Sequence, residues 1–182
     1  MEYKKTKIEG VYIIEPCVFN DARGYFMEAW KQSEFDNFVG PVRFIQDNES
    51  KSSYGVLRGL HYQKGDSSQA KLVRVIKGKV LDVAVDIRKS SSTFGQHVMV
   101  ELSEENKRQL FIPRGFAHGF LVLSNEAIFT YKVDNAYAPH QEAGIRWNDP
   151  DLAIEWPIDP KEVVTSDKDL NAPGLKEAEL FA

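Results

Sequence analysis

A histidine in the middle of a strand-like segment is the strongest indication of chemistry in this chain. The segment runs from residue 57 to 63 and reads Leu-Arg-Gly-Leu-His-Tyr-Gln. Strict alternation along a strand puts His61 and Gln63 on one face and Arg58 on the other. Histidine suits proton transfer near neutral pH, and Gly59 leaves room for a ligand beside it. The segment is therefore a candidate acid–base site, with a core histidine bonded to backbone as the plain alternative.

Further polar side chains occur where strands are expected to carry apolar ones. Two amides share one face of their segment, a lysine shares a face with two valines, and a tyrosine shares a face with a phenylalanine and a valine. These side chains are Gln46, Asn48, Lys71 and Tyr131. If the strands enclose a lumen, these groups converge in it, and an apolar pocket with convergent polar groups is the usual form of a ligand site.

This combination of side chains suits removal of a proton from a carbon next to a carbonyl group. The reaction needs a base, here His61, and a cation beside the oxygen that becomes an enolate, for which Lys71 is suitable. Tyr131 can return a proton from the opposite face, which inverts a stereocentre. The residues therefore predict an epimerase. A carboxylate should orient the imidazole, and because the strand offers none, we look for it in the C-terminal tail.

Strands are the elements that must position these side chains, and strand-like segments dominate the chain. They are short, rich in β-branched and aromatic residues, and separated by turn signals such as Lys77-Gly78. The expected strands cover residues 8–15, 24–30, 42–48, 56–63, 70–76, 80–87, 97–102, 109–112, 117–123 and 127–133. About ten short strands at regular spacing predict an all-β sandwich or jelly-roll barrel.

Helix is expected in two short segments only. Residues 33–39 start at Ser33, a candidate N-cap, and stop at Gly40-Pro41, and a second segment covers residues 175–181. From about residue 150 the pattern becomes irregular and rich in proline. We expect one domain over residues 1–182, with this tail packed over the barrel.

Composition limits the class of protein. The 182 residues, 42% of them hydrophobic, suffice for a substantial core. One cysteine, Cys17, excludes internal disulfides and cysteine-rich zinc sites. With neither a signal peptide nor an apolar run of membrane-spanning length, we expect a cytoplasmic protein without membrane contact. The net charge of −4 argues against nucleic-acid binding, whereas a small anionic ligand needs only a few cations in one cleft.

One turn resembles a motif of the cupin barrels. Residues 113–118 form a P-x-G-x-x-H turn before an apolar strand, like the second cupin motif, whose histidine usually binds a metal. A metal cupin also needs an H-x-H pair and a carboxylate on an earlier strand. Here that strand reads His61-Tyr62-Gln63, so the second histidine is missing and no metal is expected.

The ordered motifs together resemble the dTDP-4-dehydrorhamnose 3,5-epimerase family of the cupin superfamily, over essentially the whole chain. The segments that carry the resemblance are residues 19–28, 46–48, 56–63, 71–74, 82–88, 113–120, 131–132, 147–150 and 166–169. The resemblance implies a cupin-type jelly-roll barrel that inverts C3 and C5 of a dTDP-linked 4-keto-6-deoxy sugar in dTDP-L-rhamnose synthesis. It implies no metal or organic cofactor, and a homodimer in which N-terminal residues reach the neighbour's site.

The resemblance also implies roles for particular residues. His61 would remove the protons with Asp169 as its carboxylate partner, and Tyr131 would reprotonate from the other side. Lys71 would steady the enolate oxygen. The residues implied for substrate binding are Phe19, Arg23, Phe26, Glu28, Gln46, Asn48, Arg58, His118, Tyr137 and Lys168.

Some alternatives remain at this point. Arg58 can join His61 on one face only if the strand has a bulge or kink at Gly59. Asp167 and Asp86 are alternatives to Asp169 as the partner of His61. The competing functions are a single C5- or C3-epimerase on a related nucleotide 4-keto sugar, a non-catalytic sugar-nucleotide-binding cupin, and a metal-dependent cupin.

Overall fold

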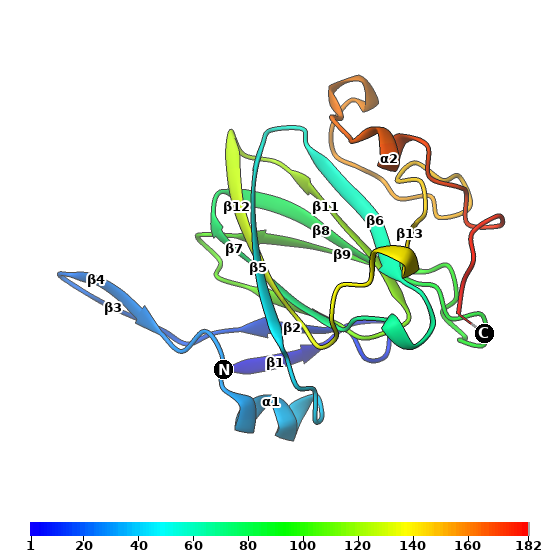
Figure 1. Ribbon diagram of the computed structural model, residues 1–182. Coiled ribbons are helices and arrows are strands. Elements are labelled where there is room, and N and C mark those ends of the chain that lie inside the picture. The colour runs from blue at the N-terminus through cyan, green and yellow to red at the C-terminus, as the bar shows by residue number, and fades with distance from the viewer. Residues whose placement is uncertain (182) are drawn as a thin grey trace.

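Two antiparallel sheets face each other in the computed structural model, which describes residues 1–181 (Figure 1). One sheet consists, in spatial order, of β1 (Glu2–Lys5), β2 (Tyr12–Glu15), β10 (Gln109–Ile112), β7 (Lys71–Lys77), β12 (Glu126–Val133) and β5 (Gln46–Ser53). The other consists of β13 (Glu142–Gly144), β6 (Leu57–Gln63), β11 (Phe116–Val122), β8 (Lys79–Asp86) and β9 (His97–Ser103). The all-β jelly-roll prediction is confirmed, although the two sheets stay separate and do not join into one closed barrel.

The remaining elements are small. β3 (Val18–Asp21) and β4 (Gly24–Met27) pair only with each other. The helices are α1 (Gln32–Phe38) and α2 (Asp167–Leu170), with 3-10 turns at Gly65–Ser67, Pro139–Gln141 and Pro160–Glu162. Within residues 1–181 no helix is long and apolar enough to cross a membrane.

The helix predictions had different outcomes. The first helix is confirmed, but it begins one residue earlier than predicted, after Lys31, so Ser33 lies inside it and is not its N-cap. The prediction of a helix over residues 175–181 is wrong, because the side chains of Leu175 and Phe181 pack separately on the five-stranded sheet and Phe181 forms a bridge with Arg88. Tertiary contacts here outweigh local helix propensity.

Most predicted strands are present, and the differences have local causes. The strand predicted over residues 42–48 is shifted, since β5 runs from Gln46 to Ser53. Its sequence Gln-Asp-Asn-Glu-Ser-Lys-Ser-Ser gives little hydrophobic signal because β5 is an edge strand. Three short strands, β1, β3 and β13, were not predicted. The predicted strand over residues 8–15 is reduced to Tyr12–Glu15.

The core lies between the two sheets. Phe129 on β12 stacks on Phe120 of β11, with 4.1 Å between ring centroids, and so joins the sheets at their centre. Around this pair the buried members of the cluster are Ile8, Val11, Val73, Val75, Val80, Ala84, Val98, Val100, Leu102, Leu110, Ile112, Phe116, Val122 and Ala127. Burial of such side chains contributes about 1.5–3 kcal/mol each. One end of the space between the sheets is therefore filled, and polar groups line the rest.

The two faces of strand β8 have different surroundings, one in the core between the sheets and one under the tail. Val80 and Ala84 belong to the core between the sheets, whereas Val83 and Val85 pack with Leu152 and other tail residues on the outer face. The tail therefore buries the more apolar face of β8. The face that also carries Asp82 points into the lumen.

The opposite outer face, on the six-stranded sheet, is covered by α1. Phe35 of α1 is fully buried against Leu72 and Phe111. Its ring makes an edge contact with that of Phe111 at 5.0 Å between centroids. The sandwich is thus held from both outer sides, by α1 on one sheet and the tail on the other.

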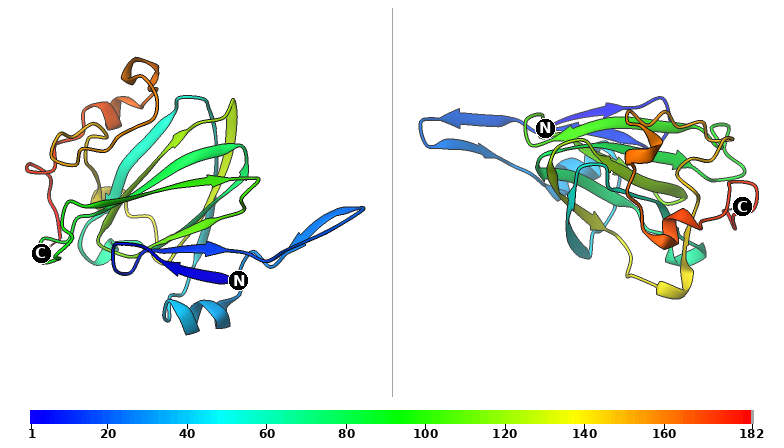
Figure 2. Two further views of the ribbon diagram at one scale, coloured as in Figure 1. Left: turned by 180° about the vertical axis from the view of Figure 1, so that it is seen from behind. Right: turned by 90° about the horizontal axis from the view of Figure 1, so that it is seen from above.

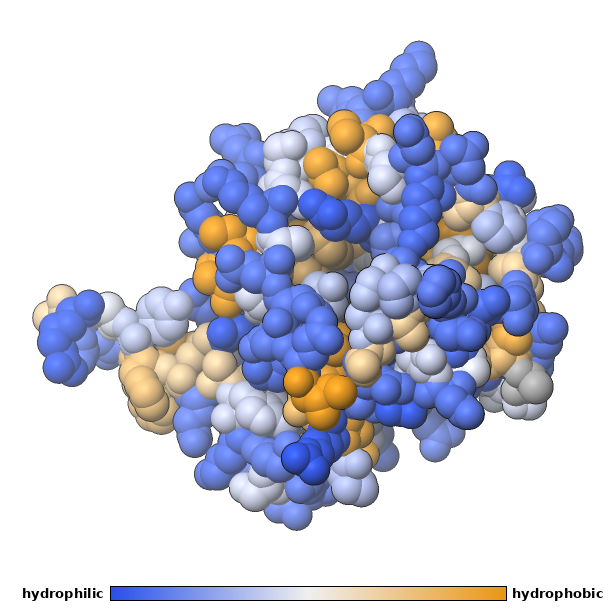
Figure 3. Space-filling view, in the orientation of Figure 1, coloured by the Kyte–Doolittle hydropathy of each residue, from blue (hydrophilic) through white to orange (hydrophobic). Residues whose placement is uncertain are grey.

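The β3–β4 hairpin projects from the body as an arm, as the two views in Figure 2 show. Phe19 and Phe26 pair in register, so both side chains lie on one face of this arm, and they are 61% and 66% exposed. Apolar side chains stand out on the arm in Figure 3, where most of the visible surface is hydrophilic.

Candidate active site

A histidine–carboxylate pair lies on the inner face of the five-stranded sheet. His61 Nε2 is 2.6 Å from Asp169 Oδ1. The second oxygen of Asp169 accepts from the backbone N–H of Gly59 at 3.2 Å. Ser166 caps α2 by accepting from the backbone N–H of Asp169. The start of α2 therefore holds this carboxylate against the imidazole.

The other two carboxylates considered lie elsewhere. Asp167 is exposed at the start of α2. Asp86 is fully buried and accepts hydrogen bonds from Arg88, Ser91 and Thr93. The structure thus places Asp169, and neither of these, against His61.

The surroundings of Asp169 favour its charged form. Burial raises the pKa of this carboxyl, but the hydrogen bonds from His61, Gly59 and Ser166 outweigh burial and leave the pKa below its usual value. A carboxylate at Nε2 selects the tautomer that carries the proton there. The lone pair of His61 is then on Nδ1, which is the atom that can act as a base.

A bulge in β6 brings Arg58 to the same face as His61. His61 pairs with His118 of β11 and Arg58 pairs with Phe120, so three steps on β6 match two on β11. The extra residue reverses the alternation between Arg58 and His61. Gly59 lies in this bulge with φ of +133°, and the bulge that the sequence required is present.

The facing sheet contributes a tyrosine and a lysine. Tyr131 of β12 packs against the inter-sheet core, and Lys71 Nζ is 6.0 Å from its ring centroid. Burial raises the pKa of Tyr131, with Arg58 lowering and Glu142 raising it less. Burial lowers the pKa of Lys71 to about 8, against the opposing pull of Asp82 and Glu142. The imidazole and the phenol therefore line opposite walls of one lumen.

A second histidine–carboxylate pair lies deeper in the lumen. His118 Nε2 is 2.9 and 3.1 Å from the two oxygens of Asp82, and Asp82 is fully buried. Burial lowers the pKa of His118, which Asp82 partly offsets. Asp82 was not predicted from the sequence, although an aspartate inside an apolar strand was a signal that could have identified it.

The mouth of the lumen is lined by charged groups. Glu142 accepts from the Tyr137 hydroxyl at 2.8 Å and pairs with Lys168 at 2.6 Å. Arg58, His61, Glu142 and Lys168 are among the residues that line a cavity of about 320 Å³ there. Glu142 was not predicted from the sequence, since β13 is too short to show a pattern.

Other predicted substrate-binding residues are divided between the lumen and the arm. Gln46 and Asn48 are on β5, where the Gln46 amide donates to Asn48 Oδ1 at 2.8 Å. Phe19, Arg23 and Phe26 are on the arm, which points away from the lumen of its own chain (Figures 1 and 2). Glu28 follows the arm and is exposed. A single chain therefore does not bring the arm residues to His61.

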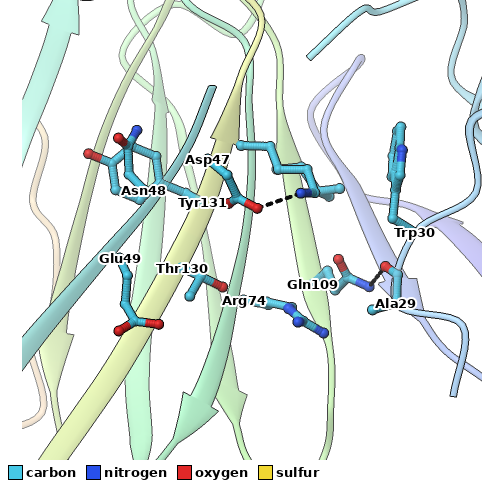
Figure 4. A pocket seen from close by; sticks show the side chains of 11 residues that line it. Ala29, Trp30, Asp47, Asn48, Glu49, Arg74, Gln109, Thr130 and Tyr131 are labelled. Carbon is cyan, nitrogen blue, oxygen red and sulfur yellow. Dashed lines mark hydrogen bonds and ion pairs between the residues drawn. The ribbon is translucent and has the colours of Figure 1, made fainter. Parts of the chain in front are cut away.

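A further cavity of about 280 Å³ lies beside the base of the arm (Figure 4). Arg74 stands in cross-strand register with Thr130 on one side and Gln109 on the other. Gln109 donates to the Ala29 backbone oxygen at 2.8 Å, which ties the segment after the arm to the sheet. Asn48 and Tyr131 also contribute to its lining.

The described residues contain no group of three or more His, Cys, Asp or Glu side chains that could hold a metal ion. In its fold and lumen the protein is of the cupin type, with an acid–base pair on one wall and a phenol and an ammonium on the other.

Comparisons with known proteins agree with this class. The family model described as dTDP-4-dehydrorhamnose 3,5-epimerase matches residues 5–177. A Shigella flexneri protein named dTDP-4-dehydrorhamnose 3,5-epimerase is 56% identical over 100% of this chain and 99% of its own. The enzyme of that name from Elizabethkingia anophelis NUHP1 superposes with a TM-score of 0.94 at 53% identity, covering 97% of each chain.

A Legionella pneumophila Philadelphia 1 structure superposes equally well. It is a dTDP-6-deoxy-D-glucose-3,5-epimerase in complex with dTDP-4-keto-L-rhamnose, with a TM-score of 0.94 and 49% identity over 98% of this chain and 94% of that one. The chain described here belongs to the dTDP-4-dehydrorhamnose 3,5-epimerase family.

Proposed function

We propose that the protein inverts C3 and C5 of dTDP-4-dehydro-6-deoxy-D-glucose, as an isomerase of dTDP-L-rhamnose biosynthesis. The observation that carries the proposal is the His61–Asp169 pair, at 2.6 Å, on the wall facing Tyr131 and Lys71. Membership of the family and the relative's complex with dTDP-4-keto-L-rhamnose support the substrate class.

The ketone at C4 makes the hydrogens at C3 and C5 acidic, so each inversion begins with proton removal. His61 takes the proton through Nδ1, and Asp169 stabilises the resulting imidazolium. The electron pair moves onto the C4 oxygen, where the Lys71 ammonium stabilises the enolate. The positive charge on Lys71 is required for this step.

Tyr131 then gives its proton to the opposite face of the carbon, which inverts the centre. Its ring packs against the inter-sheet core and burial raises the pKa of the hydroxyl, which keeps it protonated and supports this assignment. One inversion leaves an imidazolium and a phenolate. Both must exchange protons with water before the next inversion, so deuterium from heavy water enters the product.

The nucleotide requires cations and aromatic rings outside the sugar pocket. We assign its diphosphate to Arg58 and Lys168, which line the mouth. Gln46, Asn48, Tyr137 and His118 complete the binding site in the same chain. The arm residues Phe19, Arg23, Phe26 and Glu28 would serve the site of a second copy in a homodimer, and their exposure supports this. Location in the cytoplasm stays a prediction.

The test is incubation with dTDP-4-keto-6-deoxyglucose in D2O, with deuteration followed by NMR and the product trapped by a 4-ketoreductase. Deuterium at both C3 and C5, with a reducible L-sugar, is the expected result. Deuterium at one carbon only would identify a single epimerase instead. With no deuterium at either carbon, the proposed function is wrong.

A further inference from the structure

The second buried pair, His118 with Asp82, has no part in the reaction described above. Asp82 is 0% exposed, and its carboxylate oxygens accept hydrogen bonds only from His118 Nε2 among the described residues. An ionised carboxylate in such a place needs compensation by a nearby positive charge. A neighbouring group must therefore supply a positive charge.

His118 does not supply that charge. It is buried between β6 and β8 and packs over the Phe129 ring at 6.1 Å, and burial favours its neutral form. With its Nε2 facing both oxygens of Asp82, the neutral ring must carry its proton on Nε2 and a lone pair on Nδ1. His118 is then a fixed hydrogen-bond acceptor for a sugar hydroxyl.

Lys71 lies on the inward face of β7 with Val73 and Val75, so it faces the same lumen as Asp82 from the opposite sheet. Within residues 1–181 its ammonium forms no ion pair, and the anions acting on it are Asp82 and Glu142. Glu142 is already paired with Lys168 at the mouth. Asp82 is therefore the unshared negative charge of the inner lumen.

Several elements around Lys71 contribute ionisable groups. The anions that act on it are Asp82 from β8 and Glu142 from β13, its charge acts on His118 of β11, and the Tyr131 ring of β12 is 6.0 Å away. The other ionisable groups, at the mouth, are His61 and Arg58 from β6 and Asp169 and Lys168 from α2. The neighbouring strand β10 contributes only Leu110 and Ile112 to the lumen. Of the negative groups, Asp169 and Glu142 have cationic or imidazole partners of their own.

We propose that Asp82 is a positioning residue: its buried carboxylate holds Lys71 in the charged form and fixes His118 as a neutral donor from Nε2. Asp82 touches no reacting atom in this scheme and acts through its two neighbours. The inference rests on the proposed epimerase function for its consequence in catalysis. The charge and tautomer states themselves are properties of the ligand-free protein.

The first measurement is the titration of Lys71, followed through its ¹³Cε resonance and assigned with Lys71→Arg. In the wild type the midpoint is expected near pH 8. In Asp82→Asn it is expected about one pH unit lower, because an opposite charge in the lumen is removed. At pH 9 the charged fraction, and with it kcat, then falls about tenfold relative to the wild type, with a smaller change in KM.

Asp86→Asn is the matched control, since Asp86 lies on the same strand and is equally buried but binds Arg88, Ser91 and Thr93. This variant is expected to lose stability while its Lys71 titration stays at the wild-type midpoint. An unchanged Lys71 midpoint in Asp82→Asn overturns the proposal.

The second measurement needs no substitution at Asp82 and stands if that variant fails to fold. ¹⁵N–¹H correlation spectra of wild-type histidines, with His118 assigned by His118→Gln, report its tautomer between pH 6 and 9. A neutral ring protonated at Nε2 is expected, and an imidazolium or a ring protonated at Nδ1 overturns the proposal. Both measurements use ligand-free protein, so their results do not depend on the epimerase reaction. Exchange at C3 and C5 with an unchanged Lys71 midpoint would overturn only the role of Asp82, whereas a shifted midpoint without exchange would overturn only the proposed function.

Discussion

In the proposed mechanism His61 and Tyr131 perform different halves of the same proton transfer, because each stands on a different sheet. The imidazole is oriented by a carboxylate that is itself fixed by the backbone N–H of Gly59 and by the cap of α2. The phenol has no such partner in the described chain, and burial keeps it protonated by raising its pKa. A base held in one tautomer and an acid kept neutral are the states that proton abstraction and return require.

His61→Asn should abolish deuterium exchange at both carbons, because the proposed base for both proton removals is lost. A loss of about 10²–10⁴-fold in rate is the usual size for a general base. His97→Asn is the control, since His97 alternates with the core residue Val98 and lies outside the lumen. Exchange at the wild-type rate in His61→Asn, measured by NMR in D2O, would contradict the mechanism.

Tyr131→Phe should separate exchange from inversion. With His61 intact, a proton can still leave and return from the same side, so deuterium continues to enter the substrate. Inversion at C5 should fall, because the donor on the opposite wall is lost. The measurement compares deuterium incorporation with the yield of trapped L-sugar, and a parallel loss of both would assign Tyr131 to another role.

At the scale of elements, the bulge in β6 is the feature that makes one site out of Arg58 and His61. Without it the cation and the base would face opposite sides of the sheet. The bulge needs glycine for two reasons. Gly59 has φ of +133°, and a Cβ there would lie 2.5 Å from the Gly119 Cα.

Gly59→Ala should therefore cost about 3 kcal/mol or more of unfolding free energy, and activity should fall with the loss of the bulge. Gly40→Ala is the control: its φ is similar, +124°, but a Cβ would meet nothing within 4 Å. Gly40→Ala should lose only about 1 kcal/mol of unfolding free energy, which is the cost of the strained backbone conformation. Equal losses in the two variants, measured by urea unfolding, would show that close packing at Gly59 is unimportant.

At the scale of the whole molecule, the arm suggests an assembly in which copies share their sites. Phe19 and Phe26 expose large apolar rings on a hairpin that pairs with no other strand within residues 1–181. Exposed apolar surface of this kind marks an interaction site. In a two-fold dimer, each arm can enter the neighbour's lumen while offering its own lumen to the neighbour's arm.

Complementation between two inactive variants tests this arrangement. Arg23→Ala alters the exposed arm tip and His61→Asn alters the lumen, so a heterodimer of the two has one site with both groups intact. Purified heterodimers carrying two different tags should recover about half of the wild-type activity. If each arm serves its own chain, every site lacks one group and activity stays at the level of the single variants.

Residue types and local periodicity were sufficient to predict the strand-rich fold, the helix that became α1, and His61, Lys71 and Tyr131 as polar residues of the lumen, but not Asp82 or Glu142. These features depend on neighbours in the chain, since alternation and turn residues act over a few positions. The arm residues were assigned through the family resemblance, which also implied that they reach the site of a second copy.

Other features were decided only when distant segments met. The inner face of β8 is the less apolar one because the tail buries the other, and the partner of His61 is Asp169 because α2 folds back onto β6. The bulge at Gly59 depends on the register with β11, and residues 175–181 stay non-helical because their side chains pack on a sheet. Such outcomes follow from closure of the sandwich, which sets side-chain distances between segments far apart in the sequence, such as His61 and Asp169, 108 positions apart.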